Sequence, residues 1–192
     1  MDRVKVLERR WAFEDVFKIE EAIIEHRKHD GSWSPPVRQL CFERGDSVAA
    51  LLMNRGSGRL VLVNQFRYPT LEKGPGWITE IVAGGVPEGE TPEAAIVREV
   101  REETGYGVES LEHITTFYVS PGGTSERVLL YYGEVSGEPE IAEGLGVGDE
   151  DIKVIEMSPA ELWDAFLSGD QQDAKTIIAL FWLRLRDVER RR

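Results

Sequence analysis

The segment from Thr91 to Gly105 predicts one helix whose two ends are both marked in the sequence. Thr91 suits an N-cap, Pro92 stands at the first helical position, where its missing N–H costs nothing, and Gly105 suits the left-handed residue that ends many helices. Runs of apolar residues typical of strands lie on both sides of this helix. The chain is thereby constrained to a layered arrangement, and we expect an α+β or αβα-sandwich fold.

Strands are predicted in eight runs that are rich in apolar, β-branched or aromatic residues. These runs are 14–28, 37–42, 47–52, 59–66, 77–82, 114–119, 128–135 and 152–157. Two more helices are predicted, at 159–167 and from 174 to about 189, and the second carries the apolar run IIALFWL on its buried side.

The charge of the chain argues against a nucleic-acid partner. Thirty-five acidic residues stand against 23 basic ones, which gives a formal net charge of −12, whereas long nucleic acid is bound through many basic contacts to phosphate. A small anionic nucleotide is still compatible with this charge if metal ions lie between the protein and the ligand.

Cysteine content and the N-terminus indicate the compartment. Cys41 is the only cysteine, so we expect no intrachain disulfide and no cysteine-based metal site. The N-terminal residues carry charges throughout, without the apolar core of a signal peptide, and the longest apolar run, 177–183, is too short to span a bilayer. We therefore expect a soluble, cytoplasmic protein with no membrane partner.

The predicted helix carries three clustered carboxylates. Glu102 and Glu103 follow Glu99 by three and four residues, so the three side chains share one helix face. Like charges at this spacing destabilise a helix by roughly 0.2–0.5 kcal/mol per pair, and gathered oxygen ligands suit Mg²⁺ or Mn²⁺. The alternative is a solvated acidic face balanced by Arg98 and Arg101, which is the usual explanation of a charge run.

The residues around this cluster resemble the Nudix box. That motif is a glycine, five residues, a glutamate, seven residues, then Arg-Glu-aliphatic-any-Glu-Glu-any-Gly and a bulky apolar residue. The segment GGVPEGETPEAAIVREVREETGY, from Gly84 to Tyr106, departs from it only at Tyr106, where the family usually has an aliphatic residue. The matching residues are Gly84, Glu90, Arg98, Glu99, Val100, Glu102, Glu103 and Gly105. The resemblance implies a Nudix αβα sandwich with a mixed sheet.

The resemblance also implies roles for individual residues. Glu99 and Glu103 are expected to be the main carboxylate ligands of Mg²⁺, with Mn²⁺ as a substitute, and the carbonyl of Ala83 is expected to reach a metal directly. Glu102 is expected to be a further or water-mediated ligand. Arg98 is expected to orient these carboxylates through charge-assisted hydrogen bonds.

Outside the box, the chain resembles the ADP-ribose and GDP-mannose pyrophosphatase branch of the family. The segments that carry the resemblance are FERGDSVAALL, LVNQFRYPT, FYVSPGGTSERVLLYYGEV and GVGDEDIKVIEM. It implies Mg²⁺-dependent hydrolysis of a nucleoside diphosphate sugar to a nucleoside monophosphate and a sugar phosphate. The expected catalytic residues are Arg98, Glu99, Glu102, Glu103 and Glu150, of which Glu150 is also expected to be a metal ligand. The residues expected to contact the substrate are Arg44, Arg67, Gly85, Ser120, Pro121, Gly122 and Glu126.

Without the resemblance, these positions have ordinary explanations. Arg67 suits a surface position at the end of a strand, the SPGG segment suits a turn, and Glu150 suits a solvated acidic loop.

Two positions depart from the branch. Relatives often have a glutamate, proposed as the general base, where this chain has Gly148. Asp149, Glu150 or a water acidified by a metal is then left to fill that role. Leu40 stands where relatives usually have a polar residue that contacts the substrate, so the sequence leaves the preferred base and sugar open.

Other functions and an assembly also follow from the sequence. A Nudix hydrolase of another nucleoside diphosphate derivative and a non-catalytic module that binds nucleotide sugars both stay open, although the intact glutamates disfavour the second. A serine hydrolase is disfavoured because Ser120 lacks a G-x-S-x-G elbow. The resemblance predicts a small β-sheet domain over residues 1–45 that pairs two subunits into a homodimer, and a hydrolase domain over residues 46–192.

Overall fold

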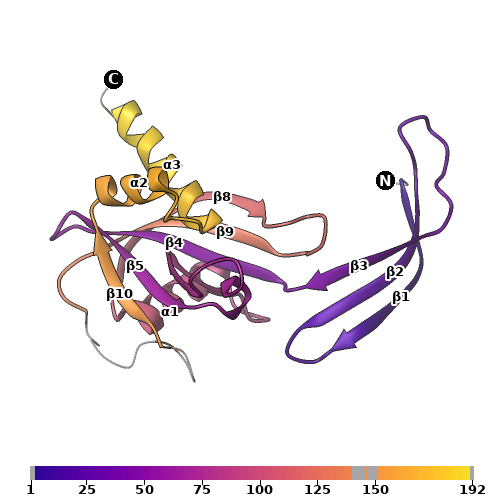
Figure 1. The fold of residues 1–192 in the computed structure, drawn as a ribbon, viewed down its shortest axis with the longest axis horizontal. Coiled ribbons are helices and arrows are strands. Elements are labelled where there is room, and N and C mark those ends of the chain that lie inside the picture. The colour runs from indigo at the N-terminus through magenta and orange to yellow at the C-terminus, as the bar shows by residue number, and fades with distance from the viewer. Residues whose placement is uncertain (1–2, 140–145, 147–150, 191–192) are drawn as a thin grey trace. The chain divides into compact units, whose positions relative to one another are not determined.

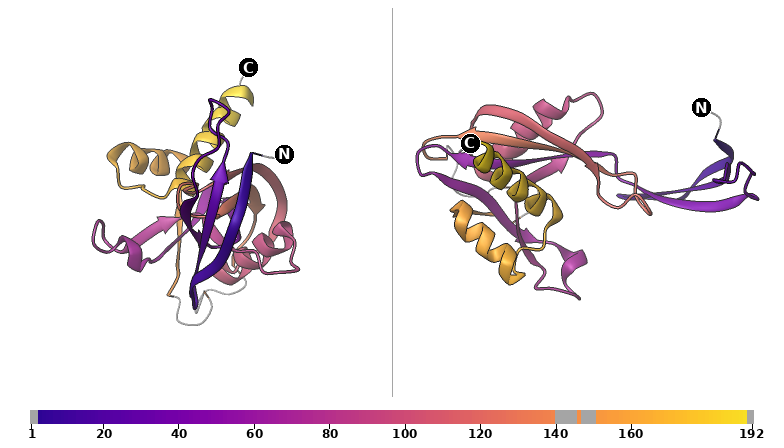
Figure 2. Two further views of the ribbon diagram at one scale, coloured as in Figure 1. Left: turned by 90° about the vertical axis from the view of Figure 1, so that its right-hand side faces the viewer. Right: turned by 90° about the horizontal axis from the view of Figure 1, so that it is seen from above.

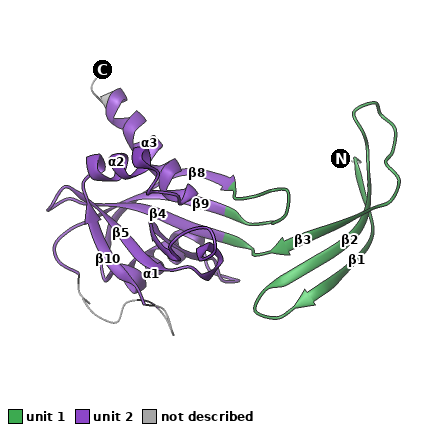
Figure 3. Ribbon diagram, in the orientation of Figure 1, with its two compact units in different colours: residues 1–46, 118–127 green, residues 47–117, 128–192 purple. Residues whose placement is uncertain are grey.

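The computed structural model describes residues 3–139, 146 and 151–190, and the chain forms two compact units (Figure 3). The first unit contains residues 1–46 together with 118–127, and the second contains residues 47–117 and 128–192. The division predicted after residue 45 stays a prediction, but the N-terminal segment shares its unit with a loop from the middle of the chain.

The first unit is built on an antiparallel sheet in the order β1 (Val4–Glu14), β2 (Lys18–His26) and β3 (Val37–Glu43) (Figure 1). The strand predicted at 14–28 corresponds to β2 alone. β1 was not predicted, because it mixes charged and apolar residues on both faces and is exposed along its whole length. The prediction missed a strand that has no buried face to impose a pattern.

The loop over residues 118–127 is attached to β3. The backbone N–H of Phe42 donates to the carbonyl of Gly123 at 2.8 Å, and Thr124 Oγ1 donates to the carbonyl of Phe42 at 2.8 Å. This loop is therefore part of the first unit through backbone contacts, although about 80 residues separate the two segments in sequence.

The second unit is built on a larger sheet. Seven described strands form it in the order β10-β5-β4-β9-β8, with β6 paired to β5 and β7 paired to β4 (Figures 1 and 2). Their bounds are β4 (Asp46–Asn54), β5 (Arg59–Phe66), β6 (Trp77–Glu80), β7 (Val82–Gly85), β8 (Val108–Tyr118), β9 (Arg127–Val135) and β10 (Lys153–Met157), and a 3-10 turn, η1 (Tyr68–Thr70), follows β5.

Helices cover both faces of this sheet, which confirms the predicted αβα sandwich (Figure 2). The helices are α1 (Pro92–Thr104), α2 (Pro159–Ser168) and α3 (Ala174–Arg190). Strand β4 divides two cores, because its alternate residues point to opposite faces. Leu52 lies in the core that contains Ile96 of α1, and Leu51 lies in the core that contains Leu162 of α2 and Leu180 of α3.

The predicted bounds of α1 are confirmed to the residue. Thr91 Oγ1 accepts a hydrogen bond from the backbone N–H of Ala94 at 3.2 Å, and Gly105 has a φ of 73° as the C-cap. The local signals for this helix therefore sufficed, as expected for caps that need only neighbouring residues.

The single strand predicted at 77–82 is two strands that break at Ile81. The backbone N–H of Ile81 donates to Thr176 Oγ1 of α3 at 2.9 Å. The chain thus passes from pairing with β5 to pairing with β4 just before the glycines at positions 84 and 85. In the described part of the chain, no helix is long and apolar enough to cross a membrane.

Candidate functional site

Helix α1 presents Glu99 directly to the glycine at the end of β7. A Cβ added at Gly84 would overlap the carboxylate of Glu99, well inside van der Waals contact. Gly84 pairs with Val48 in the sheet, so the backbone at this point is fixed and cannot easily retreat. The absence of a side chain at position 84 is what lets the carboxylate of Glu99 lie against the strand.

Glu103, one turn further along α1, is held in an unfavourable environment. The residue is 5% exposed, and burial together with the negative charge of Glu99 raises the pKa of Glu103 to about 8. Its Oε2 accepts a long hydrogen bond, 3.4 Å, from the backbone N–H of Ala83. Burial and the neighbouring carboxylate both make the charged form of Glu103 unfavourable, and a bound cation would offset that cost.

Arg98 contacts the carboxylates that the sequence placed around it. Its Nη1 donates to Glu99 Oε1 and to Glu102 Oε2, each at 2.9 Å, and its Nη2 donates to Glu90 Oε2 at 3.1 Å. The hydrogen bonds to Glu90 and to the helix glutamates hold the pKa of Arg98 above its usual range. These contacts are those of a residue that orients carboxylates, although its catalytic role stays a prediction.

The donor set suits a hard divalent cation, which prefers oxygen ligands. Carboxylate oxygens of Glu99 and Glu103 lie next to Gly84 and Ala83 of β7, so acidic oxygens and a strand end meet at one place. The part of the chain that the structure describes has no group of three acidic, histidine or cysteine side chains placed to hold a metal ion. Like charges repel, and Glu99 and Glu102 turn towards Arg98 instead.

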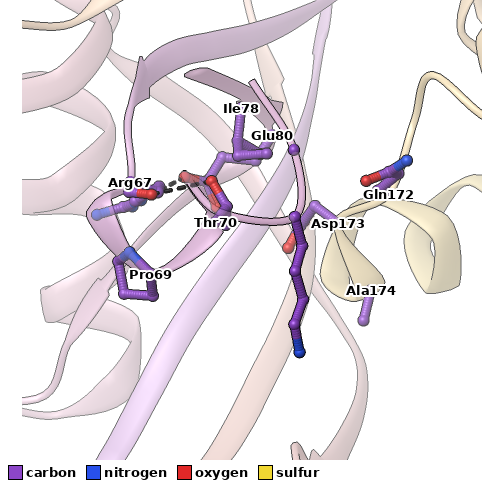
Figure 4. A pocket seen from close by; sticks show the side chains of 10 residues that line it. Arg67, Pro69, Thr70, Ile78, Glu80, Gln172, Asp173 and Ala174 are labelled. Carbon is purple, nitrogen blue, oxygen red and sulfur yellow. Dashed lines mark hydrogen bonds and ion pairs between the residues drawn. The ribbon is translucent and has the colours of Figure 1, made fainter. Parts of the chain in front are cut away.

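A second group of charged residues, which the sequence reasoning missed apart from Arg67, lies beside a cavity of about 460 Å³ (Figure 4). Glu80 Oε1 accepts from Arg67 Nε at 2.8 Å, and Glu80 Oε2 accepts from Lys175 Nζ at 2.9 Å. Lys175 also donates to Asp173 Oδ1 at 2.7 Å. The one sequence signal for this group was Glu80 itself, the only charged residue in the run WITEIV.

The substrate residues predicted in the first unit form their own group. Arg44 Nε lies 3.8 Å from Glu126 Oε2, and the backbone N–H of Arg44 donates to Ser125 Oγ at 3.3 Å. Ser120 accepts hydrogen bonds from the backbone N–H groups of Gly123 and Thr124, each at 3.0 Å, so SPGG is a turn. The structure brings Arg44 and Glu126 together, while Ser120, Pro121 and Gly122 are exposed around that turn.

The remaining predicted positions are less constrained. Gly85 is exposed and pairs with Ser47 at the end of β7, and Leu40 is 47% exposed on β3. Glu150, which was predicted as a ligand and as an alternative base, lies outside the described residues, as do the alternative base Asp149 and the departing position Gly148.

The chain is similar over most of its length to known proteins. The model of the NUDIX domain family matches residues 43–181. A GDP-mannose pyrophosphatase of Yersinia enterocolitica is 32% identical over 185 residues, which are 95% of this chain and 93% of that protein. A GDP-mannose pyrophosphatase of Cronobacter sakazakii is 34% identical over 187 residues, 96% of this chain and 97% of that protein. A crystal structure of an ADP compounds hydrolase superposes with a TM-score of 0.73 at 17% identity, covering 96% and 94% of the two chains, and supports the fold.

Proposed function

Because this chain belongs to the Nudix family, we propose that it hydrolyses the pyrophosphate bond of a nucleoside diphosphate sugar of the GDP-mannose or ADP-ribose type. The products would be a nucleoside monophosphate and a sugar phosphate. The observation that carries the proposal is the placement of Glu99 and Glu103 against the end of β7. The names of the similar bacterial proteins favour GDP-mannose within this class.

We propose that the cation is bound by the carbonyl of Ala83 and by the carboxylates of Glu99, Glu103 and Glu150. We propose Mg²⁺ as the metal, with Mn²⁺ as a substitute. When bound, the metal would supply neutralisation of the diphosphate and acidification of a water. The fit rests on the raised pKa of Glu103 and on the space that Gly84 leaves for Glu99.

The residues of the chain itself would bind and orient. Arg98 would hold Glu99 and Glu102 in place through the ion pairs described above. Arg67 would offer its guanidinium to the diphosphate, since Arg suits phosphate geometry. Arg44 would act with Gly85, Ser120, Pro121, Gly122 and Glu126 in binding the rest of the substrate, as the family resemblance implies.

The cavity beside Arg67 has a size that suits part of such a substrate. Ligand pockets in proteins commonly occupy about 300–1,000 Å³, and this one holds about 460 Å³. Arg67 and Thr70 lie on one side of it, and Gln172 and Asp173, the two residues before α3, lie on the other (Figure 4). We place a polar portion of the substrate there.

The experiment is a direct assay of the purified chain. GDP-mannose and ADP-ribose are incubated separately with the protein and Mg²⁺, and phosphate is measured after a phosphatase that acts only on the released monoesters. We expect release with at least one substrate, its loss in EDTA, and a fall of at least about a thousandfold in Glu103→Gln, since the amide lacks the negative charge with which a carboxylate holds the metal. Full activity of Glu103→Gln would refute the assignment.

Glu161→Gln is the matched control for this assay. Glu161 pairs with Arg59 at 2.8 Å and accepts from the N-cap of α2, so the same change is made at a carboxylate elsewhere in the second unit. We expect its turnover to match that of the wild-type chain within about twofold, because surface substitutions away from a site have small effects.

We also propose a cytoplasmic homodimer in which the first unit contributes the interface. The support is the exposed apolar surface of β1, which includes Val4, Leu7, Trp11 and Phe13, each between 44% and 56% exposed. Exposed apolar patches of this kind commonly mark protein interfaces. Light scattering on the full chain would give twice the 21.7 kDa mass, whereas a monomer at micromolar concentration would exclude the assembly.

A further inference from the structure

Glu80 makes two ion pairs although it is almost completely buried. It ends β6, its side chain is 4% exposed, and each of its two oxygens accepts from a different cation. A buried carboxylate is costly unless it is paired and hydrogen-bonded. Glu80 meets that condition through Arg67 on one side and Lys175 on the other.

The contacts around Lys175 have a structural role. Asp173 holds Lys175 through Oδ1, and its Oδ2 accepts from the backbone N–H of Thr176 at 2.9 Å and from Thr176 Oγ1 at 2.7 Å. Thr176 Oγ1 in turn accepts from the backbone N–H of Ile81. The start of α3 is thus fixed to the break between β6 and β7, and Glu80 is fixed with it.

Arg67 differs from Lys175, because only one nitrogen of its guanidinium donates a hydrogen bond within the described residues. Within the described residues, Arg67 donates from its side chain through Nε alone, to Glu80. The two terminal nitrogens of the guanidinium have no hydrogen-bond partner in that part of the chain, and the side chain is 39% exposed beside the cavity. An arginine held through Nε keeps its terminal N–H groups for the oxygens of a phosphate or carboxylate.

We infer that Glu80 is a positioning residue that fixes the guanidinium of Arg67 for the diphosphate of the substrate. The inference rests on the proposed function, since it assigns Arg67 an anionic ligand. Glu80 itself contacts no substrate in this arrangement, because its side chain is only 4% exposed and its two oxygens face Arg67 and Lys175. Its effect on turnover therefore passes through Arg67.

A double-mutant cycle separates this role from a general structural one. The wild-type chain, Glu80→Gln, Arg67→Ala and the double variant are compared by kcat and KM for the nucleotide sugar that the wild-type chain hydrolyses best. We expect Glu80→Gln to lower kcat/KM at least about tenfold in the wild-type chain and less than about twofold when Arg67 is absent, because residues that act as a unit are not additive. The inference would be overturned if Glu80→Gln lowered kcat/KM equally with and without Arg67, or if Glu80→Gln alone lowered it less than about twofold.

Two further measurements make the result specific. If Glu80→Gln is unfolded at the assay temperature, Glu80→Asp replaces it in the cycle, since it keeps the charge and shortens the reach by one methylene. Glu161→Gln again serves as the control, as it removes a carboxylate from another Glu–Arg pair, and we expect its kcat/KM to stay within about twofold of wild type.

A readout without turnover distinguishes failure of this inference from failure of the proposed function. In the NMR spectrum of the ligand-free protein, the Arg67 Nε–H signal, assigned by its loss in Arg67→Lys, is expected to exchange slowly with water and to exchange at least about tenfold faster in Glu80→Gln. An unchanged exchange rate would overturn the positioning role. Absence of hydrolysis by the wild-type chain with slow exchange of this signal would refute the proposed function while leaving the Glu80–Arg67 contact in place.

Discussion

The carboxylate of Glu99 fills the space above the Cα of Gly84 that any larger residue at position 84 would require. The two residues are 15 positions apart, one on α1 and the other at the end of β7. Position 84 must be a glycine so that the carboxylate of Glu99 can lie there. A larger residue at position 84 is therefore expected to act by moving Glu99.

Gly84→Ala is expected to displace Glu99 and to lower kcat/KM about a hundredfold, because misplacement of a catalytic group by about 1 Å can cost that much. Steady-state kinetics with Mg²⁺ would measure the loss. Gly107→Ala is the control, since a Cβ at position 107 meets no atom within 4 Å, and its kinetics should match wild type. Near-normal turnover in Gly84→Ala would show that Glu99 can move without consequence.

Glu103 is expected to make the metal-free chain less stable as the pH rises. Its pKa is raised from 4.5 to about 8 by burial and by Glu99, so the folded state binds the proton more tightly than the unfolded state. The stability that the protonated group contributes is fully present below pH 4.5 and is lost as the pH rises through about 8.

This dependence can be isolated with Glu103→Gln, which imitates the protonated carboxyl. The free energy of unfolding of Glu103→Gln minus that of wild type, in EDTA, is expected to increase with pH by at most about 1.4 kcal/mol per unit between those two pKa values. Urea unfolding at several pH values would measure it. A difference that stays constant from pH 5 to pH 8 would contradict the raised pKa.

Mg²⁺ is expected to stabilise the folded chain. A ligand that binds only the folded state at ten times its Kd adds about 1.4 kcal/mol to the free energy of unfolding. Thermal unfolding with and without Mg²⁺ would measure the shift, with NaCl of equal ionic strength as the control for screening. Glu103→Gln should lose most of the shift, and a shift of equal size in both chains would place the metal elsewhere.

Tyr106 is expected to contribute to stability through its hydroxyl. That hydroxyl lies 3.1 Å from Glu156 Oε1 and 3.4 Å from Asn54 Nδ2, in a largely buried network. Tyr106→Phe should lower the free energy of unfolding by about 1–2 kcal/mol, since it leaves polar partners unsatisfied. Tyr68→Phe, at a residue that is 76% exposed, is the control for chemical denaturation and should change little.

The same network explains why the last residue of the box departs from the family pattern. An aliphatic residue at position 106 could fill the core, but it could not reach the carboxylate of Glu156 on β10. The sequence showed the departure without its reason, because Glu156 lies 50 residues away.

The sequence predicted best the features that depend on neighbouring residues. The bounds of α1 follow from Thr91 and Gly105, and the contact of Arg98 with Glu102 follows from the i, i+4 spacing of a helix. These interactions close within one or two turns, so the pattern of the chain already contains them.

The features that were missed depend on residues that are distant in the chain. Lys175 and Glu80 are 95 positions apart, and no local pattern indicates which buried carboxylate will find which lysine. The break at Ile81 likewise depends on Thr176, 95 positions away. Strand β1 was missed for another reason, since both of its faces are exposed.

The attachment of the SPGG loop to β3 bears on how this protein can be divided or recombined. Phe42 and Thr124 lie 82 positions apart and yet share a hydrogen bond, and Ser125 Oγ donates to Glu43 at 2.7 Å. Removal of residues 1–46 would leave the loop over residues 118–127 without its partner strand, β3. Chimaeras that exchange N-terminal sheets between relatives should therefore carry residues 118–127 from the same parent, because the sheet and the loop are hydrogen-bonded to each other.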